Sequence, residues 1–163
     1  MPDLLVCGKG LAAGLYPVSA CSFGPRVEEF FALDPFFHPS SYGGSELAAV
    51  IVEQVVEKLT EPGFLEHVVE IGERFSAGFA DLCDRHPQRL TGFRAKGLMM
   101  ALETHSEEQG IELTRQSLVN GVLAIFANKR RQALIVMPPL VISREEADGV
   151  LVGLEAAVSA MAG

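Results

Sequence analysis

The sequence predicts a mixed α/β fold, in which short strands alternate with amphipathic helices. Short apolar runs next to glycine, such as Leu4–Cys7, are typical of strands. Between Phe64 and Leu82, apolar side chains recur at helical spacing and predict a helix with one buried face. The segment Ser143-Arg144-Glu145-Glu146 has the form of a capping box, which predicts the start of a further helix.

The first sixty residues predict two short strands followed by two helices. The run Leu4–Cys7 predicts a buried strand, and a second strand is expected around Tyr16–Cys21. Gly24-Pro25 opens a short helix, because proline is tolerated in the first turn. Turn-forming residues between Asp34 and Gly44 predict a loop, and a helix is expected over Glu46–Leu59.

The remaining residues predict a sheet with helices on one side. The segment Leu90–Glu103 is strand-rich, with a break at a Lys-Gly pair. Ser106-Glu107-Glu108-Gln109 has capping-box form and opens a helix. Two more strands are expected over Val122–Ala127 and Ala133–Met137, joined by the basic turn Asn128–Arg131.

Composition narrows the class of protein. The chain has 163 residues, 48% of them hydrophobic, and a net charge of −8, which disfavours nucleic acid or an anionic membrane surface as a partner. No apolar run approaches the roughly 20 residues needed to span a bilayer, and no basic segment of a secretory signal is present. The residues Cys7, Cys21 and Cys83 form no Cys-x-x-Cys pair, so reduced thiols in a cytoplasmic protein and no metal site are expected.

Lys9 is the first candidate for chemistry. It follows the predicted strand Leu4–Cys7 and lies between Gly8 and Gly10, which would let a flat ligand approach the backbone closely. A lysine amine presented in this way can form a Schiff base with an aldehyde cofactor. This segment alone favours the alternative of a lysine whose stem packs on the protein while its ammonium reaches water.

Four segments, in order along the chain, resemble class III aminotransferases. This group depends on pyridoxal phosphate (PLP) and includes ornithine, acetylornithine and putrescine aminotransferases. The segment Gly8–Ala20 is similar to the lysine segment of the group. The segment His38–Ser45 resembles its His-x-Ser-Thr-aromatic-Gly-Gly-Asn loop, Arg94–Met99 its Arg-Gly-Lys-Gly-Leu-Met turn, and Pro138–Ser143 its Pro-Pro-Leu junction. Four matches in register over nearly the whole chain favour the Schiff-base role for Lys9.

The resemblance implies the C-terminal part of a fold-type I PLP-dependent transferase. Residues 1–60 would be the last strands of the large PLP-binding domain with the connecting helix, and residues 61–163 the small α/β domain. The family's phosphate-binding turn, its ring-stacking aromatic and the aspartate that pairs with the pyridine nitrogen lie upstream of this part. The isolated chain is therefore expected to be inactive, and to expose apolar surface that a missing half would cover.

The resemblance also implies roles for individual residues. Lys9 would form the Schiff base with PLP and then move a proton between substrate and cofactor as acid and base. Ser41 replaces a threonine that, in the family, binds the cofactor phosphate across the dimer interface, and serine keeps the hydroxyl. The complete protein is thus expected to be a homodimer. The neighbouring Gly43 and Gly44 allow a turn whose N–H groups face the same anion.

Two other loop residues carry weaker expectations. Tyr42 is expected to pack rather than to bind. His38 matches a family position, with an ordinary hydrogen-bonded loop histidine as an equal alternative.

The chain departs from the family at Ile135. Many amino-acid-specific members carry an arginine three positions before the Pro-Pro pair, where it clamps the substrate α-carboxylate. Isoleucine cannot do this, which favours a substrate without an α-carboxylate or one that other residues bind. Arg130 and Arg131 are expected to form a solvated basic turn instead.

The resemblance implies transamination between an amine or amino acid and a keto acid, with PLP as cofactor and these small molecules as partners. The segment around Lys9 is equally compatible with another PLP chemistry on the same fold, such as that of an aminomutase. A non-catalytic remnant that only dimerises is the third alternative.

Overall fold

The computed structural model describes residues 2–34, 36 and 39–161. Contacts between residues divide the chain into two compact units, Met1–Phe64 and Leu65–Gly163. The division falls at the start of a long helix, close to the boundary that the sequence predicts after residue 60.

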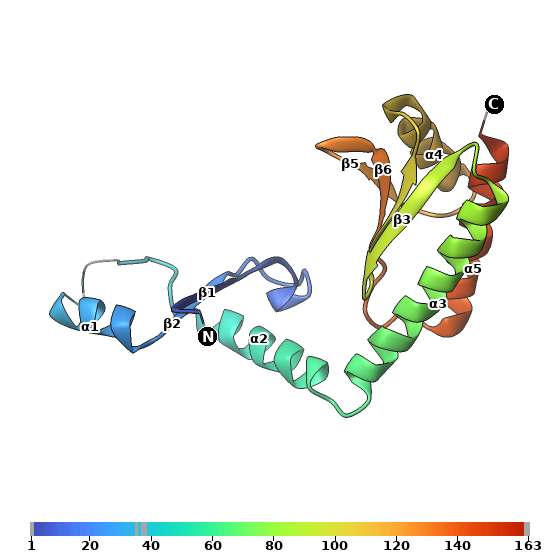
Figure 1. Ribbon diagram of the computed structural model, residues 1–163. Coiled ribbons are helices and arrows are strands. Elements are labelled where there is room, and N and C mark those ends of the chain that lie inside the picture. Colours follow the sequence, from blue (N-terminus) through green and yellow to red (C-terminus); the bar gives the residue numbers. More distant parts are fainter. Residues whose placement is uncertain (1, 35, 37–38, 162–163) are drawn as a thin grey trace. The chain divides into compact units, whose positions relative to one another are not determined.

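The first unit contains a two-stranded sheet and two α-helices (Figure 1). Strands β1 (Leu4–Cys7) and β2 (Ala20–Phe23) pair in antiparallel fashion. A short 3-10 helix, η1 (Lys9–Ala12), follows β1 after a single residue. Helices α1 (Pro25–Leu33) and α2 (Glu46–Leu59) follow β2, so both predicted helices are confirmed.

Two expectations for this unit are wrong. The second strand begins at Ala20 rather than at Tyr16, because η1 and the bend after it precede the residues that pair with β1. The predicted burial of β1 is not observed either, since Leu4, Leu5 and Val6 are 52%, 54% and 75% exposed. A sheet of two strands provides too little neighbouring surface to cover them, and their exposure agrees with the apolar surface expected of a partial domain.

Helix α2 has the bounds that the sequence predicts, because both of its ends are capped by hydroxyl groups. At its start, Ala48 N–H donates to Ser45 Oγ at 3.4 Å. At its end, the Thr60 hydroxyl donates to the carbonyl of Val56 at 2.9 Å. The helix contacts η1, which carries Lys9. The capped helix therefore supports the turn that holds the candidate lysine.

The second unit contains four strands and three helices. In chain order they are α3 (Phe64–Arg85), β3 (Leu90–Lys96), β4 (Met99–Thr104), α4 (Glu107–Val119), β5 (Ile125–Ala127), β6 (Arg130–Val136) and α5 (Arg144–Ala160). The strands form an antiparallel sheet in the order β3-β4-β6-β5. Helices α3 and α5 run beside each other along one side of the sheet (Figure 1), which confirms the predicted arrangement.

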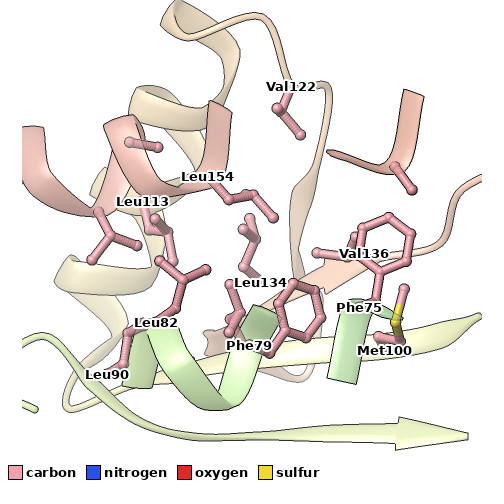
Figure 2. Close-up of a cluster of buried hydrophobic side chains, with 14 of the residues drawn as sticks. Phe75, Phe79, Leu82, Leu90, Met100, Leu113, Val122, Leu134, Val136 and Leu154 are labelled. Atoms are coloured by element: carbon pink, nitrogen blue, oxygen red, sulfur yellow. The ribbon is translucent and has the colours of Figure 1, made fainter. Parts of the chain in front are cut away.

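The core of the second unit lies between this sheet and its helices. Figure 2 shows Phe75 and Phe79 of α3 against Leu134 of β6, with Leu113 of α4 and Leu154 of α5 completing the cluster. All five side chains are fully buried. The helical spacing of apolar residues in α3 is therefore confirmed as a core-facing stripe.

The hairpin between β5 and β6 differs from the sequence prediction. Arg130 and Arg131 belong to strand β6, and only Asn128 and Lys129 form the turn. The expectation of a turn at these two arginines is wrong, because pairing of Arg130 with Ala127 of β5 extends β6 to that residue. Both arginines are exposed to solvent, as expected. Strand β5 in turn begins later than expected, since the residues after α4 are held by that helix, where Val122 N–H donates to the Ser117 carbonyl at 2.8 Å.

The two predicted capping boxes form to different degrees. At α5, both reciprocal bonds between Ser143 and Glu146 are present. At α4, Gln109 N–H donates to Ser106 Oγ, but the Gln109 side chain accepts from His105 N–H instead of from the cap residue. Only half of this predicted box is therefore confirmed.

No helix in the described ranges is long and apolar enough to cross a membrane. Over the same ranges, no group of three or more His, Cys, Asp or Glu residues could hold a metal ion. The three cysteines are free thiols.

Candidate functional site

Lys9 lies on a strained backbone at the first position of η1. Its φ angle is 54°, in the left-handed region that costs roughly 1–2 kcal/mol for a residue with a side chain. Among the described residues other than glycine, only Ala13 shares this conformation, with φ 49°. The Lys9 side chain is exposed, and its amine makes no hydrogen bond or ion pair with any described residue. The fold therefore holds a free primary amine just beyond the end of β1.

The turn around Lys9 is fixed by its neighbours. Leu11 N–H donates to the carbonyl of Gly8 at 3.2 Å, and Ala13 N–H donates to the carbonyl of Gly10 at 3.0 Å. Glycine leaves the backbone beside Lys9 accessible. A Cβ at Gly10 would meet nothing within 4 Å, and one at Gly8 would first meet the Ser19 side chain at 3.8 Å. A flat ligand could thus approach the chain on either side of the amine.

Ser41 lies in the exposed turn that precedes helix α2. Gly43 N–H donates to the Ser40 carbonyl at 3.2 Å, and Gly44 has a φ of 71°, a conformation that suits glycine. The Ser41 hydroxyl makes no bond with any described residue. Tyr42 is 94% exposed, so it does not pack within this unit as expected, although it contributes to the lining of a cavity in the same unit.

His38 lies outside the described residues.

A cavity of about 720 Å³ lies between the segment after η1, the turn before α2, and α2 itself. Tyr16 and Val18 form one wall, and Gly43, Gly44 and Ala48 lie on another. Neither Lys9 nor Ser41 belongs to its lining. Within this unit the structure therefore does not bring the two predicted cofactor residues into one cavity.

Ile135 occupies the middle of β6, where the family resemblance would place an arginine. It is half-buried and lies opposite Ala101 of β4 on one side and Ile125 of β5 on the other. Ala101 is in turn opposite Arg94 of β3, so these residues form one row across the sheet. An apolar side chain therefore occupies the position where the resemblance implies an α-carboxylate clamp.

Sequence reasoning missed Glu103, which forms ion pairs with two arginines beside this row. Its carboxylate forms ion pairs with Arg94, at 2.7 Å, and with Arg130, at 3.0 Å, although its side chain is only 15% exposed. The hairpin between β3 and β4 places Glu103 diagonally across from Arg94. Arg94 and Glu103 lie on the two strands that flank the Lys96-Gly97 turn, so counting residues outward from that turn could have indicated this pair.

The residues present fit part of a PLP site. PLP requires an amine for its aldehyde and hydrogen-bond donors for its phosphate. The free Lys9 amine satisfies the first need, and the unbonded Ser41 hydroxyl can serve the second. A Cβ at Gly44 would meet nothing within 4 Å, so an anion could also approach the backbone beside Ser41.

Comparisons with known proteins place the chain in a family. The family model described as "Aminotransferase class-III" matches residues 1–158. An uncharacterized aminotransferase from Archaeoglobus fulgidus is 35% identical over 148 residues, which cover 91% of this chain and 35% of that relative. The chain spans about a third of the length of the curated relatives it matches.

Solved structures share the fold. The ornithine aminotransferase from Toxoplasma gondii ME49 matches with a TM-score of 0.87 and 26% identity, covering 98% of this chain and 37% of that one. An amine transaminase from an uncultivated Pseudomonas species, solved in a PLP-bound form, matches with a TM-score of 0.83 and 23% identity over 97% of this chain and 38% of its own. These matches confirm the fold class as part of a fold-type I transaminase. The chain belongs to the class III aminotransferase family.

Proposed function

We propose that the complete protein is a PLP-dependent aminotransferase that moves an amino group between an amine or amino acid and a keto acid. The observation that carries the proposal is the free amine of Lys9, held on a strained turn between two open glycine positions in a chain of this family. When bound, PLP supplies the aldehyde and the electron-withdrawing ring that this chemistry needs.

Lys9 has two tasks in this proposal. It attaches the cofactor, and it then moves a proton at the reacting carbon of the substrate. Both tasks require an amine without a competing partner, and Lys9 makes no ion pair with a described residue. Its flexible four-carbon stem lets the amine move while the turn stays fixed by the bonds to Gly8 and Gly10.

Ser41 donates its hydroxyl to the cofactor phosphate of a partner subunit, so the complete protein is a homodimer. Two observations support this contact between subunits. The hydroxyl has no partner among the described residues of its own chain, and Ser41 and Lys9 share no cavity within their unit. A serine at the surface of a dimer can reach a site that its own chain does not form.

One observation supports the proposed cofactor, and another supports the proposed compartment. The Pseudomonas amine transaminase contains PLP, which supports the same cofactor here. Free Cys7, Cys21 and Cys83 support a reducing compartment, and we place the dimer in the cytoplasm.

Labelling of the complete protein tests the role of Lys9. Borohydride reduction in the presence of PLP should attach the cofactor to Lys9, identified by peptide mass mapping. Lys9→Ala should remove this label and lower turnover by roughly 10²–10⁴-fold, the scale of acid–base catalysis. Lys58→Ala is the matched control, because Lys58 lies at the far end of α2 in an ion pair with Glu61. A label on Lys58, Lys96 or Lys129 would contradict the assignment.

The fate of the amino group separates the alternative chemistries. A ¹⁵N-labelled amine donor should pass its nitrogen to an added keto acid. Retention of ¹⁵N on the original carbon skeleton, at a new position, would identify an aminomutase. A complete protein that binds no PLP under any condition would indicate a non-catalytic remnant.

A further inference from the structure

Ala12 and Ala48 are the only buried residues among those described in the first unit. Ala12 is 1% exposed at the end of η1, and Ala48 is 6% exposed in the first turn of α2. These two elements contact each other. Burial in this unit is thus confined to two alanines, one on the turn that carries Lys9 and one on the helix beside it.

The turn around Lys9 depends on contacts with its surroundings. Lys9 and Ala13, on either side of Ala12, have φ angles of 54° and 49°, in the left-handed region. Strained residues keep such conformations only where the surrounding structure over-determines them. The Lys9 side chain is exposed and bonds to no described residue, so it does not hold the turn. Ala12 is the one buried side chain of η1, and a neighbouring element can hold the turn through it.

The start of helix α2 fixes the position of Ala48. The Ala48 N–H donates to Oγ of the cap residue Ser45 at 3.4 Å, and the Ala49 N–H donates to the Ser45 carbonyl at 3.0 Å. These bonds hold the first turn of the helix, from which Ala48 contributes the only buried side chain of α2. A methyl group is short, so the backbones of η1 and α2 can approach each other closely at this point.

We propose that Ala48 is a positioning residue for Lys9 and acts through Ala12. Ala48 touches neither cofactor nor substrate. Its methyl group covers Ala12, which keeps the strained turn formed and holds the Lys9 amine where it attaches PLP. Such support matters because a reacting group displaced by about 1 Å can lose about 10²-fold in rate. This inference rests on the proposed aminotransferase function and adds a residue to it.

Removal of the Ala48 methyl group tests this role in the complete protein. Ala48→Gly is a cleaner change than a larger residue, because Ala48 also lines the cavity of about 720 Å³, into which a larger side chain could extend. Ala49→Gly is the matched control, because Ala49 is exposed at the next position of the same helix. Both changes carry the same cost in helix propensity, so a difference between them reports the buried contact.

Amide hydrogen exchange measures the stability of the turn without any cofactor. The N–H groups of Leu11 and Ala13 close the turn, and peptides over residues 8–15 report them by mass spectrometry. Ala48→Gly should speed their exchange about fourfold, the factor that corresponds to the loss of one buried methyl group at about 0.8 kcal/mol. Ala49→Gly should leave this exchange unchanged.

The rate of PLP attachment measures the consequence for the Lys9 amine. PLP is mixed with the cofactor-free protein, and the visible absorbance of the attached cofactor is followed with time. Ala48→Gly should slow attachment by about the same factor, since fewer molecules hold the amine in place, whereas Ala49→Gly should not. A purely structural role would lower the urea midpoint and leave the rate equal in the two variants. Equal rates, or equal exchange, in Ala48→Gly and Ala49→Gly would overturn the proposal.

A double variant tests whether Ala48 acts through Ala12. Ala12→Gly removes the group that Ala48 covers, and it should speed exchange of the turn by itself. Adding Ala48→Gly to this variant should then change the exchange little further, because the contact is already lost. Fully additive effects of the two substitutions would overturn the route through Ala12.

The outcome can be separated from that of the proposed function, because hydrogen exchange needs neither PLP nor turnover. Faster exchange in Ala48→Gly, in a protein whose Lys9 never attaches PLP, would support the contact between the two alanines and contradict the aminotransferase. Attachment of PLP at Lys9 with unchanged exchange and rate in Ala48→Gly would support the aminotransferase and contradict the positioning role.

Discussion

Gly110 of helix α4 lies directly against the backbone of Arg131 in strand β6. A Cβ at Gly110 would be 1.9 Å from the Arg131 carbonyl oxygen and 2.8 Å from Cα of Gln132. Both atoms belong to the backbone, so no change of rotamer can relieve the contact. The missing side chain thus allows the close distance between α4 and the sheet, and it places Leu113 in the core.

Gly110→Ala should therefore destabilise the protein, although alanine is the better helix former. Overpacking of this kind costs typically 1–3 kcal/mol, and we expect the upper end because backbone must move. Gly149→Ala is the matched control in helix α5, where a Cβ would meet nothing within 4 Å. That change should raise the free energy of unfolding by roughly 0.5–1 kcal/mol. Urea unfolding measures both, and equal effects would contradict the described packing of α4.

The helices could be predicted from the sequence because their signals are local. Ser45, Ser106 and Ser143 mark the starts of α2, α4 and α5, and the apolar stripe through Phe75 and Phe79 marks α3. Caps and periodicity depend on residues a turn or two apart, which a single sequence contains.

The features that the sequence predicts wrongly, or does not predict, depend on residues far away along the chain. Arg130 joins β6 because of pairing across the sheet, and the exposure of Val6 depends on how few strands lie beside β1. The candidate lysine was found by resemblance, but its φ of 54° could not be foreseen, because a lysine seldom adopts that region. Glu103 was missed since its partners, Arg94 and Arg130, come from two other strands.

The backbone strain at Lys9 predicts an unusual order of stability between two variants. Lys9→Gly should be more stable than Lys9→Ala by about 1 kcal/mol, since glycine adopts a φ of 54° without steric cost. At Lys58, in the regular helix α2, the same pair should show the reverse order, with glycine less stable by roughly 1 kcal/mol. Thermal or urea unfolding of the four variants tests this. Identical orders at the two positions would show that the Lys9 turn is not strained.

Ion pairs between α3 and α5 predict a loss of stability in acid. The Arg144 guanidinium, bonded to the Glu70 carboxylate at 2.5 and 2.8 Å, lowers the pKa of Glu70 from its ordinary value of 4.5. Arg74 likewise lowers the pKa of Asp148 from 3.8 through bonds of 2.5 Å. A carboxyl whose pKa is lower in the folded state stabilises the protein above its unfolded pKa. This stability is lost as the pH falls through the folded pKa.

The urea midpoint should therefore drop as the pH falls from about 5 to about 2, in addition to any effect of net charge. Glu70→Gln removes one contributor, so its midpoint should be lower at neutral pH and should fall less on acidification. Glu73→Gln, on the same helix and without an ion pair to any described residue, is the control for the change in charge. If both variants followed the same pH curve, the pair between Arg144 and Glu70 would not contribute to folding.

Ser41 predicts a cofactor site shared between subunits. In the complete protein, Ser41→Ala should weaken PLP retention by about 1.5–3 kcal/mol, the value of one hydrogen bond to a charged group. Ser41→Thr should be neutral, because the hydroxyl is kept, and Ser22→Ala in the exposed strand β2 is the control. PLP titration under dialysis measures retention, and sedimentation measures the oligomeric state.

Mixed dimers decide whether Ser41 acts across the interface. A dimer of one Ser41→Ala chain and one Lys9→Ala chain would contain one intact site if the serine of each chain serves the lysine of the other. Tight PLP binding should then return at half of the sites, although neither homodimer shows it. If Ser41 served the lysine of its own chain, the mixed dimer would contain no intact site, and retention would stay at the weakened level. A fully active monomer would contradict the shared site outright, because no second subunit would be present to supply the hydroxyl.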